Sequence, residues 1–341
     1  MQMRDDLGIT TKLENGKAYL EFALPEKIGR LLSALQIEIW EGAEGERLVF
    51  HGEYSSEEAD SMTALLLRPH LWDGMRDPYV YLVKAQGRFR SVEYGEKMGG
   101  MEKEEKLDPA EDITGEVEMY WRQELTIYDV RVVEKKGILL NEKEFLPHEV
   151  VYRLPPQISD AGTRVEQVRR DLERLVQMGV NVIRLEGTGT GAEGVNCSEV
   201  RTFYSLCRKR GFLTGDLWIR PENLPVYRGL PGETTCQALL AADGRTLTER
   251  YYYYQAKWSS EPVLYPVLST LHRQENGLLS LTIYSNQKKV VLYVDGVLFL
   301  FQSAASGDPE FIFEDIPVAK LPLHLAVEAG NLSISLTVSK I

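Results

Sequence analysis

The chain has 341 residues, of which 43% are hydrophobic and 26% charged, a composition typical of a globular protein with room for two or three domains. Its 51 acidic and 39 basic residues give a formal net charge of -12. This charge is spread along the chain, so it excludes nucleic acid as a partner, because phosphate binding needs clustered cations. Three irregularly spaced cysteines, Cys197, Cys207 and Cys236, exclude a disulfide framework and a zinc site.

No segment of the sequence has the pattern of a membrane span or a signal peptide. Residues 1–7 lack an apolar core. The longest apolar run, from Val290 to Phe301, is interrupted by Asp295-Gly296 and is too short to cross a bilayer. We therefore expect a cytoplasmic protein with no membrane contact, although a chain with its leader removed would have the same sequence.

Residues 1–94 are predicted to form an immunoglobulin-like β-sandwich. Three segments alternate apolar and polar residues with a period of two, namely 18–24, 35–40 and 79–83, and Asn15-Gly16 is a turn signal. Residues 95–136 are predicted to hold an acidic loop followed by connecting strands. The loop has too few apolar residues to order itself; an acidic recognition tail is the alternative.

Residues 137–220 carry an α/β pattern. Asn141 begins a predicted hairpin turn between two short strands. Val165, Val168 and Leu172 then recur at helical spacing, and Gly179 stands where a helix would end, because glycine adopts a left-handed conformation without cost. A short apolar run at 180–185 predicts a strand buried on both faces. A second helix from residue 198, ending before Gly211, and a strand from residue 212 complete the pattern.

Residues 221–250 are rich in proline and glycine and are predicted to be a linker, with at most one short helix at 235–241. Residues 251–341 are predicted to be a second immunoglobulin-like sandwich of about seven strands. Asp295-Gly296 is a type I′ hairpin signal within it. The predicted strands are 251–254, 279–284, 290–294, 297–300, 311–313, 324–327 and 332–336.

Three separated groups of motifs resemble one family. The first is Pro69-His-Leu-Trp-Asp with Pro78-Tyr-Val-Tyr; the second includes Met178-Gly-Val-Asn-Val-Ile-Arg; the third includes Tyr253-Tyr-Gln-Ala-Lys-Trp. In this order they resemble glycoside hydrolase family 2, the group of β-galactosidases and β-glucuronidases. The resemblance implies a β-sandwich before a (β/α)8 barrel, a second sandwich after it, and hydrolysis of a glycoside.

The chain departs from this family in the length of its barrel region. A (β/α)8 barrel needs about 200 residues or more, whereas only 85 residues run from Gly137 to Pro221. The family's acid/base glutamate and nucleophilic glutamate have no counterpart in that stretch. We therefore predict a multi-domain β plus α/β fold, in which two immunoglobulin-like sandwiches flank a truncated (β/α) barrel remnant. No residue is predicted to be catalytic.

Four residues are the candidates for ligand binding. Glu186 follows a predicted parallel strand, and Asp216 lies in or after another, so a carboxylate pair is one hypothesis; solvated or capping carboxylates are the alternative. Arg184 matches an arginine that lies near the sugar site in the family, but it could also form an ion pair with Glu186 or Asp216. Trp258 resembles a family tryptophan at the edge of the second sandwich, where packing is the alternative role.

No metal or cofactor site is predicted. The five histidines are scattered, and the glycines at 187, 189 and 191 do not match the spacing of a dinucleotide or phosphate-binding loop.

The sequence leaves three hypotheses for the function of the protein. The first is a degenerate relative of the family, without glycosidase catalysis, that is a carbohydrate-associated or structural module. The second is an active β-galactosidase or β-glucuronidase completed by homo-oligomerisation, and the third is a protein-binding scaffold.

Overall fold

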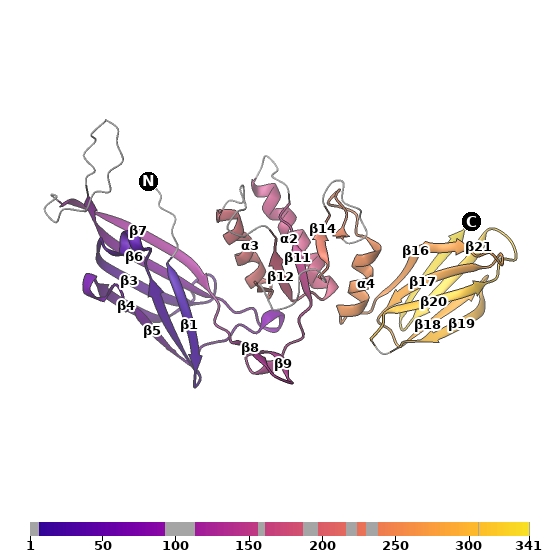
Figure 1. Ribbon diagram of the computed structural model, residues 1–341, viewed down its shortest axis with the longest axis horizontal. Helices are drawn as coiled ribbons and strands as arrows, with labels where there is room; N and C mark the ends of the chain where they lie inside the picture. Colours follow the sequence, from indigo (N-terminus) through magenta and orange to yellow (C-terminus); the bar gives the residue numbers. More distant parts are fainter. Residues whose placement is uncertain are drawn as a thin grey trace, which may run out of the picture. The chain divides into compact units, whose positions relative to one another are not determined.

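The computed structural model describes residues 7–92, 113–155, 161–186, 197–215, 224–229, 238–305 and 307–340 (Figure 1). The chain divides into two compact units, Met1–Phe145 and Leu146–Ile341. The greater part of the predicted acidic loop, the glycine-rich loop after Glu186 and the candidate Asp216 lie outside the described residues.

The first unit is built on two antiparallel sheets, as predicted. Their strand orders are β1-β2-β5 and β4-β3-β6-β7. Side chains of β2 alternate between exposed and buried, because only one face of the sheet packs on the core. Asn15 and Gly16 have φ angles of 51° and 72° and make the predicted turn between β1 and β2. The strands are β1 (Gly8–Glu14), β2 (Lys17–Ala23), β3 (Leu32–Glu41), β4 (Arg47–Ser55), β5 (Thr63–Leu67), β6 (Tyr81–Val92) and β7 (Ile113–Leu125).

The sequence prediction ended this sandwich too early. β7 pairs with β6 along its whole length and is therefore a strand of the sandwich, not a connecting strand. Three short helices also belong to this unit, α1 (Glu26–Gly29), η1 (Ser56–Glu58) and η2 (Gly74–Arg76).

A small three-stranded sheet follows the sandwich in the chain and is made of β8 (Val130–Val133), β9 (Gly137–Leu140) and β10 (Lys143–Glu144). Asn141 and Glu142 have positive φ angles and form the predicted hairpin turn between β9 and β10.

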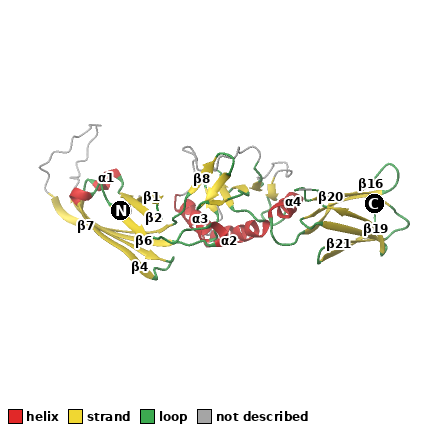
Figure 2. Ribbon diagram, turned by 90° about the horizontal axis from the view of Figure 1, so that it is seen from below, coloured by secondary structure: helices red, strands yellow, loops and turns green. Residues whose placement is uncertain are grey.

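The second unit begins with a parallel five-stranded sheet, which we call the α/β layer together with its helices. The sheet order is β13-β12-β11-β14-β15, and every pair is parallel. Helices α2 (Ala161–Met178) and α3 (Cys197–Lys209) pack their apolar faces against one side of it (Figure 2). Gly179 ends α2 with φ +87°, as predicted. The strands are β11 (Glu149–Tyr152), β12 (Val182–Leu185), β13 (Leu213–Thr214), β14 (Val226–Arg228) and β15 (Ala238–Leu240).

Three predictions for the segment after β13 were wrong. Residues 238–240 form strand β15 where a helix was expected, and β14 and β15 extend the sheet where the sequence predicted a linker. The Tyr251–Tyr254 run, predicted as a strand, is part of helix α4 (Glu249–Trp258). Tyrosine favours strands, but this helix buries Tyr251 in the core of the α/β layer and stacks Tyr252 on Tyr265 of the following sandwich, and these contacts outweigh the local preference.

The chain ends in a second sandwich, the C-terminal sandwich. Its sheets have the orders β16-β17-β20 and β19-β18-β21-β22, all antiparallel. The predicted turn at Asp295-Gly296 joins β18 to β19, with φ angles of 49° and 80°. The strands are β16 (Leu264–Arg273), β17 (Leu279–Ser285), β18 (Lys289–Val294), β19 (Val297–Ser303), β20 (Glu310–Ile316), β21 (Leu323–Ala329) and β22 (Leu332–Val338). No helix among the described residues is both long and apolar enough to cross a membrane.

Candidate functional site

The carboxyl ends of the parallel strands form the candidate site. The chain starts the sheet at β11, adds β12 and β13 on one side, and then adds β14 and β15 on the other side. In open α/β sheets, ligands bind beyond the carboxyl ends of the strands where the order reverses in this way. In this sheet that point lies between β11 and β14, where the chain places Arg153 and Arg228.

Arg153 links three strand ends. Its Nε forms an ion pair with Oε2 of Glu186, and its Nη2 lies 3.3 Å from Oε1 of the same carboxylate. Its Nη1 donates to the backbone carbonyl of Arg228 at 3.3 Å. This two-pronged contact fixes the guanidinium plane against the carboxylate. Sequence reasoning missed Arg153, although its position directly after a buried strand was the available signal.

Arg184 makes a different ion pair from the two that the sequence suggested. Its Nε donates to Oε1 of Glu149 at 2.9 Å, and the Glu149 side chain is completely buried. The parallel register sets Arg184 beside Val151, two residues from Glu149 on the neighbouring strand. Because a strand's side chains alternate between faces, Glu149 and Val151 share the face that Arg184 occupies. The expected partner Glu186 is engaged by Arg153 instead, and Asp216 lies outside the described residues.

A second buried charge lies on the helix side of the sheet. Asp171 of α2 is 1% exposed and accepts hydrogen bonds from the hydroxyl groups of Tyr152, at 2.9 Å, and Tyr227, at 3.1 Å. It also accepts from Nη2 of Arg228 at 2.6 Å, and the Arg228 side chain is itself 5% exposed. Burial, and next the nearby Asp171 charge, raise the pKa of both tyrosines, which therefore stay neutral donors.

Trp258 lies apart from the candidate site. It is the last residue of α4, and its ring stacks on His148, with the ring centres 5.2 Å apart and an angle of 7° between the planes. His148 directly precedes β11, so this contact is at the amino end of that strand, whereas Arg153 and Glu186 follow the carboxyl ends. The ring also contacts Tyr254 at 4.5 Å. The structure therefore gives Trp258 a packing environment and does not bring it together with Arg184 or Glu186.

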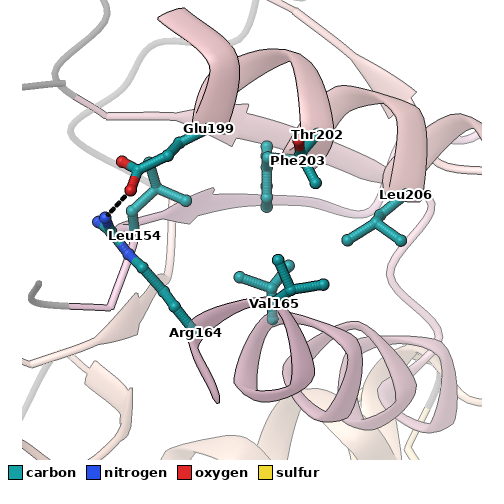
Figure 3. A pocket seen from close by; sticks show the side chains of 8 residues that line it. Leu154, Arg164, Val165, Glu199, Thr202, Phe203 and Leu206 are labelled. Carbon is teal, nitrogen blue, oxygen red and sulfur yellow. Dashed lines mark hydrogen bonds and ion pairs between the residues drawn. The ribbon is translucent and has the colours of Figure 1, made fainter. Parts of the chain in front are cut away.

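A small pocket of about 160 Å³ lies between α2 and α3 (Figure 3). Its walls are mainly apolar, and at one end Nη1 of Arg164 pairs with Oε1 of Glu199 at 2.6 Å. This ion pair ties the first turns of the two helices together. The lining residues are Leu154, Arg164, Val165, Val168, Glu199, Thr202, Phe203 and Leu206.

The charged side chains of the candidate site are paired with one another. Glycoside hydrolysis needs one carboxyl group that carries a proton and a second one that acts as nucleophile or base. Among the described residues, Glu186 follows the carboxyl end of β12 and Glu149 begins β11, and each of these two carboxylates is held by an arginine. Within the described ranges no group of three or more metal-ligating side chains could hold a metal ion.

In chain order the protein has a β-sandwich, a parallel α/β layer and a second β-sandwich, and this fold is the one found in solved structures of glycoside hydrolase family 2 proteins. No protein-family model and no curated protein matches the sequence. Solved structures do. An FMN-binding β-glucuronidase from Facaelibacterium prausnitzii aligns over 98% of this chain and 74% of its own, with a TM-score of 0.62 and 14% identity.

Two further structures have the same arrangement. A β-glycosidase from Bacteroides vulgatus aligns over 98% of this chain, with a TM-score of 0.63 and 11% identity. A glycosyl hydrolase family 2 member from Bacteroides cellulosilyticus aligns over 98%, with a TM-score of 0.60 and 12% identity. This chain spans only 64% and 63% of their respective lengths. Identities this low show a shared fold and leave activity to be tested.

Proposed function

We propose that the protein is a degenerate relative of glycoside hydrolase family 2, without glycosidase catalysis, that serves as a carbohydrate-associated or structural module. The observation that carries the proposal is the pairing of Glu149 with Arg184 and of Glu186 with Arg153. A carboxylate in such a pair is occupied by its arginine, whereas a retaining glycosidase needs two carboxyl groups that face the sugar about 5 Å apart.

The length of the α/β layer supports the same proposal. It forms five parallel strands in the described part of the chain, and β13 and β15 at its two ends have only two and three residues. A (β/α)8 barrel has eight strands, and its catalytic residues come from the ends of several of them. In this proposal the layer is a truncated barrel remnant that lies between the two sandwiches in the sequence and carries Arg153 at a strand end.

Activity and sugar binding test the proposal separately. The purified protein is assayed with a panel of nitrophenyl β-glycosides and, in parallel, on a glycan array. We expect no turnover above the buffer rate. Turnover that persists through purification and disappears in Glu186→Gln, but not in the exposed control Glu166→Gln, would overturn the proposal. Retention on a glycan that is weakened in Arg153→Gln favours the carbohydrate-associated role, and no retention favours the structural one.

The alternative is a glycosidase completed by a second copy. The short edge strand β13 favours it, because an edge strand offers backbone groups to another chain, whereas the outer side of β15 already bonds to residues 246–248 of the same chain. It predicts that turnover rises with the square of protein concentration at low concentration. Turnover proportional to concentration, or none, rejects this version.

A further inference from the structure

The pocket between α2 and α3 is separate from the ion pairs at the strand ends. Leu154 follows Arg153 in the chain, but its side chain lines the pocket (Figure 3), whereas Arg153 contacts Glu186. None of the four residues that form the two ion pairs of the candidate site lines this pocket. The pocket is therefore a second place where a ligand could lie.

The size and the walls of the pocket restrict what it can hold. Its volume of about 160 Å³ is close to the roughly 150 Å³ of an apolar protein cavity that binds benzene, so one six-membered ring fits. A sugar ring carries hydroxyl groups around its edge, and apolar walls would leave most of them without a partner. An apolar ring is therefore favoured over a sugar. The apolar walls are Val165 and Val168 of α2, Phe203 and Leu206 of α3, and Leu154.

One end of the pocket is polar but neutral overall, because Arg164 and Glu199 meet there (Figure 3). Their side chains are 13% and 30% exposed and are joined by a hydrogen bond from Nη1 to Oε1 at 2.6 Å. Nε of Arg164 and Oε2 of Glu199 are shielded from water and have no hydrogen-bond partner in the described part of the chain. This end therefore has both a donor and an acceptor to spare.

We propose that this pocket binds a small neutral molecule made of one apolar ring with a hydroxyl group, such as a phenol. The ring lies against Val165 and Phe203, and the hydroxyl group lies at the Arg164–Glu199 pair. A hydroxyl group suits this end, because it accepts from a guanidinium group and donates to a carboxylate. Glu199, the more exposed partner, turns to admit it. A charged ligand is disfavoured, because one member of the pair has the same charge.

Saturation-transfer NMR at pH 7 with phenol as the probe tests the proposal. We expect transfer from the wild-type protein to the phenol ring protons, with a dissociation constant on the order of 1 mM for so small a ligand. Benzoate has the same ring and a negative charge, and it should bind at least about 10-fold more weakly. Toluene has a methyl group in place of the hydroxyl and should bind at least about 3-fold more weakly, because it leaves the polar end without a partner.

Val165→Phe tests whether phenol binds in this pocket. The larger side chain fills the space between the helices, so the dissociation constant for phenol should rise at least about 10-fold. The matched control is Val176→Phe on the same helix, because Val176 is 39% exposed and does not line the pocket. It should leave the dissociation constant unchanged, and circular dichroism should show that both variants are folded.

Glu199→Gln tests the charge at the polar end. It removes the counter-charge of Arg164, so the affinity for benzoate should rise at least about 10-fold and exceed that for phenol. The control Glu173→Gln, which breaks the exposed pair with Arg210 outside the pocket, should keep phenol preferred.

Three results would overturn the proposal, and none depends on glycan binding or glycosidase activity. The first is no saturation transfer to phenol at millimolar concentrations of the wild-type system. The second is phenol binding that is unchanged in Val165→Phe or is lost equally in Val176→Phe. The third is toluene or benzoate bound as tightly as phenol by the wild-type protein, or a preference that Glu199→Gln does not reverse.

Discussion

The buried carboxylate of Asp171 gives the sharpest test of how the α/β layer is held together. Asp171 is the shared acceptor for one residue of β11, Tyr152, and two residues of β14, Tyr227 and Arg228. Changing it to asparagine keeps the shape of the side chain but removes the charge and turns one acceptor oxygen into a donor. The amide group then faces donors that are already present.

The cost follows from the burial of the partner. The Arg228 side chain is 5% exposed, so Asp171→Asn leaves a guanidinium group without its counter-charge inside the protein. Breaking a buried pair in this way costs about 3–5 kcal/mol. Arg174, whose Nη1 lies 3.8 Å from Oδ1 of Asp171, is 31% exposed and can turn to water, so it adds little to this cost. The expected loss is a large fraction of the roughly 5–15 kcal/mol that a domain has in total.

Hydrogen–deuterium exchange with mass spectrometry is the suitable assay, because a chain of several domains does not unfold in one step. Peptides from α2 and β14 should exchange faster in Asp171→Asn, while those from the first unit keep the wild-type rate. The control is Glu166→Gln on the same helix, whose pair with Arg169 is 3.9 Å long and exposed, and it should change the opening free energy by less than about 0.5 kcal/mol. Equal protection of α2 in the two variants would refute the reasoning.

Three further changes test other contacts in the second unit. Gly179→Ala should lower the opening free energy of α2 by at least about 1–2 kcal/mol in hydrogen–deuterium exchange, because Gly179 has φ +87° and a Cβ there would lie 2.4 Å from the backbone oxygen of Trp258. Protection of α2 equal to wild type would contradict this. Burial lowers the pKa of His148, so the folded state favours the neutral imidazole. The contribution of His148 to stability is therefore complete above about pH 6.5 and decreases as the pH falls below that value. His148→Gln should therefore flatten the decline in stability between pH 7 and pH 5, and an unchanged pH profile would count against this role. The Asn286 side chain accepts a hydrogen bond from the backbone nitrogen of Val263 at 2.8 Å and donates to two carbonyl groups of the loop after α4. Asn286→Ala should therefore lower the stability of the C-terminal sandwich by about 2–3 kcal/mol and make this loop sensitive to proteolysis. Asn276→Ala, at an exposed position, is the control and should do neither.

The sequence was informative wherever a local rule determines the backbone. Three predicted turns and one predicted helix end need positive φ angles, and the structure has these angles. The turns are at Asn15-Gly16, Asn141 and Asp295-Gly296, and the helix ends at Gly179. The two sandwiches could be predicted for a similar reason, because alternation of apolar and polar side chains is a short-range pattern. The resemblance to glycoside hydrolase family 2 agrees with the fold of the solved structures that are similar to the chain.

The failures concern contacts between distant segments. Four consecutive tyrosines have no period, so residues 251–254 look like a strand until the packing of Tyr251 and Tyr252 is known. Strands β14 and β15 have three residues each, too few to show a pattern. The partner of Arg184 depends on the parallel register of β11 and β12, which no local feature of the sequence specifies. For the same reason, the contact of Arg153 with Glu186 could not be foreseen.

Helix α4 belongs to two hydrophobic environments at once. Tyr251 lies in the core of the α/β layer, whereas Tyr252 stacks on Tyr265 and Tyr253 meets the edge of Tyr284 in the C-terminal sandwich. A fragment cut just after Trp258 would keep Tyr251 in the core of the α/β layer but would expose Tyr252 and Tyr253, because Tyr265 and Tyr284 would be missing. The α/β layer and the C-terminal sandwich should therefore unfold together in one cooperative transition, because the tyrosines of α4 pack against both.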